Sequence, residues 1–130
     1  MLEDAAAIDF YTSLPYGIAM QTVVGTPPFL ASATRAGMTE AERAAAVDPV
    51  AADPQAGDMV SGGGGIRKLR VAGRGKGKSG GYRVLTYYME PDRPAFLLWV
   101  LNKSKSANLS DAQTAMLKQA AKEIRDARQS

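Results

Sequence analysis

The chain contains neither cysteine nor histidine among its 130 residues. Without cysteine it can form no disulfide and can use no thiolate nucleophile, which suits a reducing compartment. Without histidine it has no imidazole base, no Ser-His-Asp triad and no His-ligated metal. Any catalysis must therefore come from other side chains.

Acidic side chains are missing from one long stretch. No Asp or Glu occurs between Met59 and Met89, whereas the segment from Gly65 to Arg83 carries seven Lys or Arg residues. Protein surfaces normally intersperse both signs of charge, so the stretch is typical of a site that holds a polyanion. A two-metal nuclease needs clustered carboxylates, and this stretch has none. The predicted site therefore uses no metal.

The net charge of +3 hides a strong asymmetry along the chain. Residues 1–65 hold two basic and eight acidic side chains, a balance of −6. Residues 66–105 hold ten basic and two acidic side chains (+8), and residues 106–130 hold four and three (+1). Such a split suggests one surface that faces nucleic acid and a separate acidic surface.

Long apolar runs are also missing, and Glu3 and Asp4 stand where a signal peptide carries basic residues. We therefore expect a cytoplasmic protein that neither is secreted nor spans a membrane. The length and the apolar content of 45% suit one small globular domain. We expect residues 1–19 to be an extension that need not fold and residues 20–130 to form the domain.

Hydrophobic patterns and capping residues predict the secondary structure. Thr39 with Glu42 and Ser110 with Gln113 form capping-box patterns at two helix starts, and Pro49 should stop or kink the second helix. Strands are expected at residues 20–24, 66–72, 82–89 and 96–102, and helices at 29–36, 39–47 and 111–128. This order predicts the α+β class, with an antiparallel sheet and helices on one face.

The glycine-rich joint between two of these strands invites a nucleotide-binding interpretation. Gly77–Ser79 reads like the end of a Walker A loop, but the first glycine of that motif would fall on Ala72. A strand follows where the motif needs a helix N-terminus to receive the phosphate. The same defect affects the G-x-G-x-x-G pattern that begins at Gly75. Nucleotide binding of either kind is therefore disfavoured.

Alternation along the strands indicates which cations share a face. Lys68 and Arg70 lie on one face of their strand, and Arg67 lies on the other. Neighbouring strands are only about 4.8 Å apart, so we expect Lys68, Arg70, Arg83 and Lys103 to converge in one cleft. The alternative is a basic face that is simply exposed to solvent. Trp99 lies in the apolar run FLLWVLN, which favours a core position over a base-stacking surface.

The same residues resemble a known family. The segment GGGGIRKLRVAGRGKGKSGGYRVLTYY, followed by FLLWVLNKSKSANLS, is similar to the RelE/ParE superfamily of bacterial type II toxins and to its HigB-like branch. The resemblance extends to TPPFLASATRAGMTEAERAAAVDPVAADPQAGD and covers about residues 20–125. It implies a small RelE-like domain: a twisted antiparallel sheet with two N-terminal helices packed on one face, and a C-terminal helix.

The resemblance also implies a function. RelE- and HigB-like toxins are ribosome-dependent messenger RNA endonucleases. They are inhibited by an antitoxin that we expect to contain a helix-turn-helix. The implied partners are that antitoxin, the ribosome and its message, with operator DNA bound only through the antitoxin complex. No cofactor is implied. Motif matching places catalytic roles on Lys68, Arg70, Arg83 and Lys103, and phosphate binding on Arg67, Arg74, Lys76 and Lys78.

Departures from the family pattern limit what can be transferred. Many relatives have V-Y-A-K-N where this chain has Val100–Ser104, so a tyrosine and an asparagine near the cleft are absent. Residues 1–19 have no counterpart in the pattern. Any mechanism that gives chemical roles to the missing tyrosine and asparagine does not apply here.

The remaining residues are sufficient for one kind of RNA cleavage. RNA supplies its own nucleophile, the ribose 2′-hydroxyl, so the protein needs only to orient the strand and stabilise charge. Arg70 and Arg83 are expected to clamp the phosphate, because a guanidinium matches two of its oxygens. Lys68 or Lys103 is expected to exchange the proton. Two alternatives stay open: a non-nucleolytic gyrase inhibitor, as in the ParE branch, and a nucleic-acid-binding module without catalysis.

Overall fold

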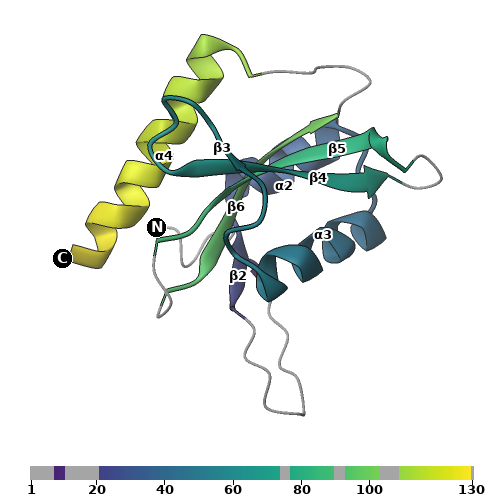
Figure 1. Ribbon diagram of the computed structural model, residues 1–130, viewed down its shortest axis with the longest axis horizontal. Coiled ribbons are helices and arrows are strands. Elements are labelled where there is room, and N and C mark those ends of the chain that lie inside the picture. The colour runs from purple at the N-terminus through teal and green to yellow at the C-terminus, as the bar shows by residue number, and fades with distance from the viewer. Residues whose placement is uncertain (1–7, 11–20, 74–76, 90–92, 103–108, 130) are drawn as a thin grey trace.

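A computed structural model describes residues 8–10, 21–73, 77–89, 93–102 and 109–129. Within these residues, six strands form one sheet in the order β1-β2-β6-β5-β4-β3, and helices pack against both of its faces (Figure 1). The strands are β1 (Ile8–Phe10), β2 (Val23–Gly25), β3 (Asp58–Met59), β4 (Ile66–Gly73), β5 (Gly77–Tyr87) and β6 (Ala95–Asn102). The helices are α2 (Pro27–Arg35), α3 (Glu40–Ala52) and α4 (Asp111–Gln129). The predicted α+β class is confirmed.

The sheet is mixed rather than fully antiparallel. Strands β3, β4, β5 and β6 pair antiparallel in sequence, but β2 pairs parallel with β6. A parallel pair needs a long crossover, and the two helices with the β4–β5 hairpin supply one. Strand β1 falls within the predicted extension and pairs antiparallel with β2. The rest of residues 1–19 lies outside the described residues.

Both faces of the sheet are covered: the expected packing of the two N-terminal helices on one face is confirmed, and the C-terminal helix covers the other face. Val84 and Leu85 are neighbours on β5, point to opposite faces and are both almost fully buried. The Val84 face packs against α2 and α3, and the Leu85 face packs against α4. Because the central strand is apolar on both sides, it requires a cover on each face.

Helix α3 continues past Pro49 to Ala52, so the prediction that it ends near Val47 was wrong. Proline removes the hydrogen bond to the carbonyl of Ala45, but both residues are exposed, where water can satisfy that carbonyl. Beyond the proline, Val50 and Ala51 are buried in the core. Burial of this last turn outweighs the lost hydrogen bond.

Helix α2 closes the edge of β6 beyond the point where β2 stops. The backbone N–H and the hydroxyl of Thr26 both donate to the carbonyl of Leu97, at 3.1 and 2.9 Å. The buried hydroxyl of Ser32 accepts the Val100 N–H at 2.9 Å and donates to the Phe29 carbonyl at 3.1 Å. The N-cap residue Thr26 and the Ser32 side chain of α2 therefore replace a neighbouring strand along this edge.

Helix α4 begins with the predicted capping box: Gln113 N–H donates to Ser110 Oγ, and Ser110 N–H donates to Gln113 Oε1. The buried residues Leu117, Ala121 and Ile124 lie along its inner stripe. Arg125 donates to the Tyr87 hydroxyl at 3.1 Å, which raises the pKa of its guanidinium. In the described part of the chain, no helix is long and apolar enough to cross a membrane.

The Ser32 bridge gives a testable stability effect. Replacing Ser32 with Ala leaves the buried Val100 N–H without its acceptor, so we expect a loss of about 1–3 kcal/mol in the free energy of unfolding. Urea denaturation measures this loss. Thr34→Ala is the matched control. Among the residues that the structure describes, its exposed hydroxyl bonds only the Leu30 carbonyl of the same helix, so it should change stability by less than about 0.5 kcal/mol. Equal effects of the two variants would contradict the bridging role.

Candidate functional site

The pairing of β4 with β5 determines the position of the predicted cations. Arg70 lies directly opposite Arg83, and Lys68 lies opposite Leu85. Directly paired residues project from the same face of a sheet, so the three cations share a face. On the other face, Leu69 and Val71 pack against the α2–α3 core. The predicted alternation of β4 is therefore confirmed.

Two adjoining hollows lie on this face. The first, of about 240 Å³, is lined by Val60, Ser61, Lys68, Arg83, Leu85, Leu101, Leu109 and Thr114. The second, of about 200 Å³, is lined by Gly57, Asp58, Lys68, Arg70 and Arg83. Lys68 and Arg83 line both, so the two hollows adjoin at these side chains, and we call the pair of hollows the basic cleft. Three of the four predicted catalytic residues thus meet in one place.

Apolar side chains support the cations from below. Leu85 and Leu101 are almost fully buried and belong to the cluster that packs against α4. Both also line the first hollow. Lys68 and Arg83 therefore project from packed strands rather than from loops, which limits how far their backbones can move.

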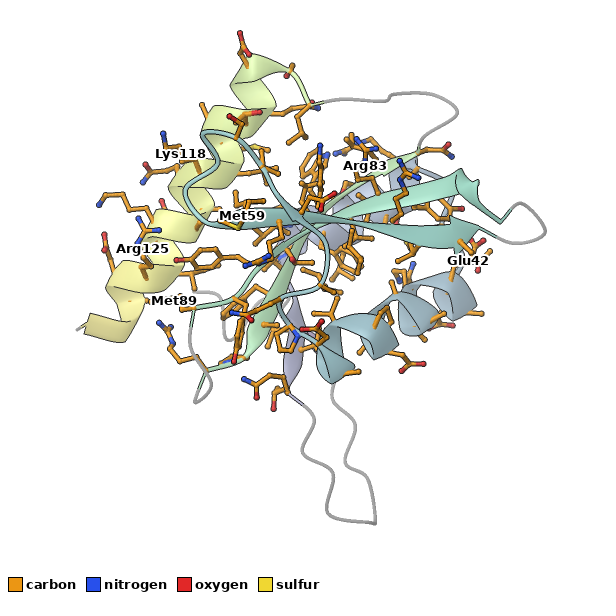
Figure 2. All side chains as sticks on the ribbon, viewed as in Figure 1. Glu42, Met59, Arg83, Met89, Lys118 and Arg125 are labelled. Carbon is orange, nitrogen blue, oxygen red and sulfur yellow. The ribbon has the colours of Figure 1, made fainter. Side chains whose placement is uncertain are left out.

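The backbone next to Arg83 is anchored on the opposite face. The buried Tyr82 donates through its hydroxyl to Glu42 Oε1 at 3.0 Å and to the Gly37 carbonyl at 3.3 Å. Glu42 also accepts the Thr39 N–H at the start of α3, as its predicted capping box requires. Figure 2 shows Arg83 and Glu42 on opposite sides of the β4–β5 hairpin. The contact between Tyr82 and α3 therefore holds β5 in position from behind.

Asp58, which the sequence analysis did not consider, also lines the cleft. It lies on β3 directly opposite Lys68. Ser61 and Thr114 add hydroxyl groups, from the turn after β3 and from the first turn of α4. No local pattern in the sequence signals these residues, because β3 is only two residues long and α4 is remote along the chain. Tertiary packing alone brings them to the cations.

Of the other predicted site residues, Arg67 is the one whose side chain the structure describes. Arg67 lies on the opposite face of β4 and donates to the Gln55 carbonyl at 3.1 Å. Lys103, Arg74 and Lys76 lie outside the described residues. Lys78 belongs to β5, but the position of its side chain is not described. Their proposed roles stay predictions, and the placement of Arg67 separates it from Lys68, Arg70 and Arg83.

Trp99 is only half-buried, at the margin of the α4 core. The pairing of β5 with β6 shifts register between Leu85 and Thr86, which leaves Leu98 as an extra residue on β6. This bulge interrupts the alternation next to Trp99. The guanidinium of Arg35 lies 5.5 Å from the centre of the Trp99 ring, within the range of a cation–π contact. The core position predicted for Trp99 is therefore only partly correct.

The arrangement favours an anionic ligand. Like charges directly opposite each other on paired strands destabilise a sheet, and Arg70 faces Arg83 in this way. Among the residues that the structure describes, neither Lys68 nor Arg70 forms an ion pair. Lys68 is half-buried while Arg70 is exposed, so the charges line the wall and rim of the cleft. A bound phosphate would relieve their repulsion.

The fold and the site define a small α+β domain with a cationic cleft on one face of its sheet. Residues 28–130 match the model of a family described as the RelE toxin of the RelE/RelB toxin–antitoxin system. The match spans most of the chain, and the chain belongs to this family. The protein is therefore a toxin of a toxin–antitoxin system, and its family implies a cognate antitoxin as partner. The resemblance to the RelE/ParE superfamily is confirmed.

The cleft geometry predicts how a polyanion binds. Replacing Arg70 with Ala should weaken binding of single-stranded RNA and lower the slope of log K against log salt by about 0.7, the value of one phosphate contact. Fluorescence anisotropy at several salt concentrations measures both quantities. Arg43→Ala is the matched control, because it removes the same charge from α3, behind the sheet. An equal change of slope in both variants would show that RNA does not use this face.

Proposed function

We propose that this toxin is an endoribonuclease that cleaves messenger RNA on the ribosome, using the ribose 2′-hydroxyl of the substrate as nucleophile. One observation carries the proposal: Lys68, Arg70 and Arg83, from two adjacent strands, line a single cleft. Membership of the RelE toxin family supports it. Lys103, also expected to act in catalysis, completes the proposed set.

In the proposed reaction, the phosphodiester lies between Arg70 and Arg83. A guanidinium offers two parallel N–H donors to two phosphate oxygens and stays charged throughout. The two residues are cross-strand partners, with Cα atoms about 5 Å apart as such pairs require. They can therefore contact one phosphate from two sides. Because these charges are positioned before the reaction, they stabilise the negative charge that develops on the phosphoryl oxygens.

Two proton transfers accompany the cleavage. The 2′-hydroxyl loses its proton as its oxygen attacks phosphorus, and the departing 5′-oxygen gains a proton as the bond from phosphorus breaks. Lys68, on the wall of both hollows, or Lys103 supplies the second proton. The products are a 2′,3′-cyclic phosphate and a 5′-hydroxyl end.

The ribosome has a clear role in this proposal. Acid–base groups contribute about 10²–10⁴-fold each, and a free RNA strand rarely places its 2′-oxygen in line with the bond to be broken. The basic cleft holds the phosphate but is open at its rim, where Arg70 and Asp58 are exposed. A ribosome that bends the message at the decoding site would supply the alignment that the cleft lacks.

Arg83→Ala should abolish growth arrest on induction and lower the rate of message cleavage by about 10²–10³-fold, the usual effect of losing one group that stabilises developing charge. Arg83→Lys should restore only part of the rate, since an ammonium cannot make the bidentate contact. Growth curves and primer extension on purified ribosomes carrying a defined message measure these effects.

The control for Arg83→Ala is binding of the cognate antitoxin, which should stay as tight as in the wild type if the variant folds normally. Primer extension also separates the alternatives. An endoribonuclease gives cuts in register with codons, whereas a gyrase inhibitor gives broken DNA and intact messages. A variant that still arrests growth and cleaves messages would contradict the site assignment. A wild type that binds RNA without cutting it would favour a binding module.

A further inference from the structure

We propose that Asp58 is the general base that takes the proton from the attacking 2′-hydroxyl. The inference rests on the proposed function and adds a residue to it. In a site made only of Lys and Arg, the proton acceptor would have to be a lysine that has already lost its proton, since arginine stays protonated and a lysine ammonium has no lone pair. An ionised carboxylate accepts a proton directly. Among the residues that the structure describes, Asp58 is the one acid that lines either hollow of the basic cleft.

The position of Asp58 is built into the fold. Strand β3 pairs antiparallel with β4, so Asp58 stands directly opposite Lys68 and projects from the same face. The residue before it, Gly57, has a φ of +92°, and a Cβ there would lie 2.3 Å from the Lys68 carbonyl oxygen. Only glycine allows β3 to approach β4 this closely. The sequence Gly57–Asp58 therefore places a carboxylate at the edge of the basic cleft.

Among the described residues, the Asp58 carboxylate is not paired with a neighbouring cation. In the part of the chain that the structure describes, Asp58 makes no ion pair with Lys68 or Arg70, although all three line the same hollow of about 200 Å³. Acid and cations therefore face each other across open space instead of being joined. Asp58 is also exposed, so a ribose can reach it. A nucleotide placed in this hollow would have the cations on its phosphate and the carboxylate near its sugar.

The resulting step is balanced. Asp58 takes the proton of the 2′-hydroxyl while the 2′-oxygen forms a bond to phosphorus. The bond from phosphorus to the 5′-oxygen breaks, and that oxygen takes a proton from Lys68 or Lys103. After the products leave, the protonated Asp58 and the neutral lysine return to their starting states by exchange with water. No metal, oxidant or other reactant enters the step.

An alternative role for Asp58 is to reduce repulsion among the cations, and the two roles predict different results. Neutralising an acid that only balances charge should strengthen RNA binding and leave the chemical step unchanged or faster, because the cleft becomes more positive. Neutralising a base should also strengthen binding, but it should slow the chemical step. The rate of the chemical step therefore separates a base from a charge-balancing residue.

The test is Asp58→Asn, which keeps the shape of the side chain and removes its charge. On ribosomes carrying a defined message, the single-turnover cleavage rate at saturating toxin should fall by about 10²-fold or more. Affinity for the same complex carrying a 2′-deoxy nucleotide at the cleavage site, which cannot react, should be unchanged or higher. Asp48→Asn is the matched control, because Asp48 is an exposed acid on α3 behind the sheet, and its cleavage rate should equal that of the wild type.

Each outcome has one meaning. A wild-type cleavage rate in Asp58→Asn, with wild-type protein that cleaves normally, would overturn the role of Asp58 and leave the proposed function intact. Weaker binding of the deoxy complex with no loss of the saturated rate would overturn it as well. Absence of cleavage by the wild type under the same conditions would instead contradict the proposed function. Unchanged thermal unfolding of the variant confirms that a slower rate does not reflect a damaged fold.

Discussion

The register between β4 and β5 is the constraint on which the site depends. A shift of one residue would send every side chain of one strand to the other face. Arg83 would then enter the α2–α3 core, and Val84 would enter the cleft. The register is enforced because β5 is buried on both sides, with Val84 and Leu85 almost fully enclosed in different cores. Burial of apolar side chains therefore holds the cations together against their mutual repulsion.

The cleft exists because α4 covers only part of its face. Ile66 and Tyr87 are cross-strand partners at one end of the β4–β5 hairpin, and both are buried in the α4 core. Further along the hairpin, Arg70 and Arg83 are partners that line open space instead. Figure 1 shows α4 at the end of the hairpin where β4 begins, away from the end where β4 stops and β5 begins. The same strands thus serve as core at one end and as site at the other.

Much of this arrangement was predictable from local patterns. The ranges of β4, β6 and α4, the capping boxes of α3 and α4, and the shared face of Lys68 and Arg70 follow from periodicity and helix-start chemistry, which involve near neighbours in the sequence. The continuation of α3 through Pro49 did not follow, because the burial of Val50 is a tertiary effect. The half-exposed position of Trp99 did not follow either, since it depends on a bulge in β6 and on Arg35 from α2.

By itself, the sequence determined the class of the fold, the charge of the site and the strands that carry it. The absence of histidine and cysteine and the run of cations between Met59 and Met89 decide what chemistry is possible before the chain folds. Only the tertiary structure decided that β2 joins β6 in parallel, that helices cover both faces, and that Asp58 stands across from Lys68. These features depend on contacts between segments that are remote in sequence. They are stabilised by packing and by close approach of backbones, and no local pattern in the sequence indicates these contacts.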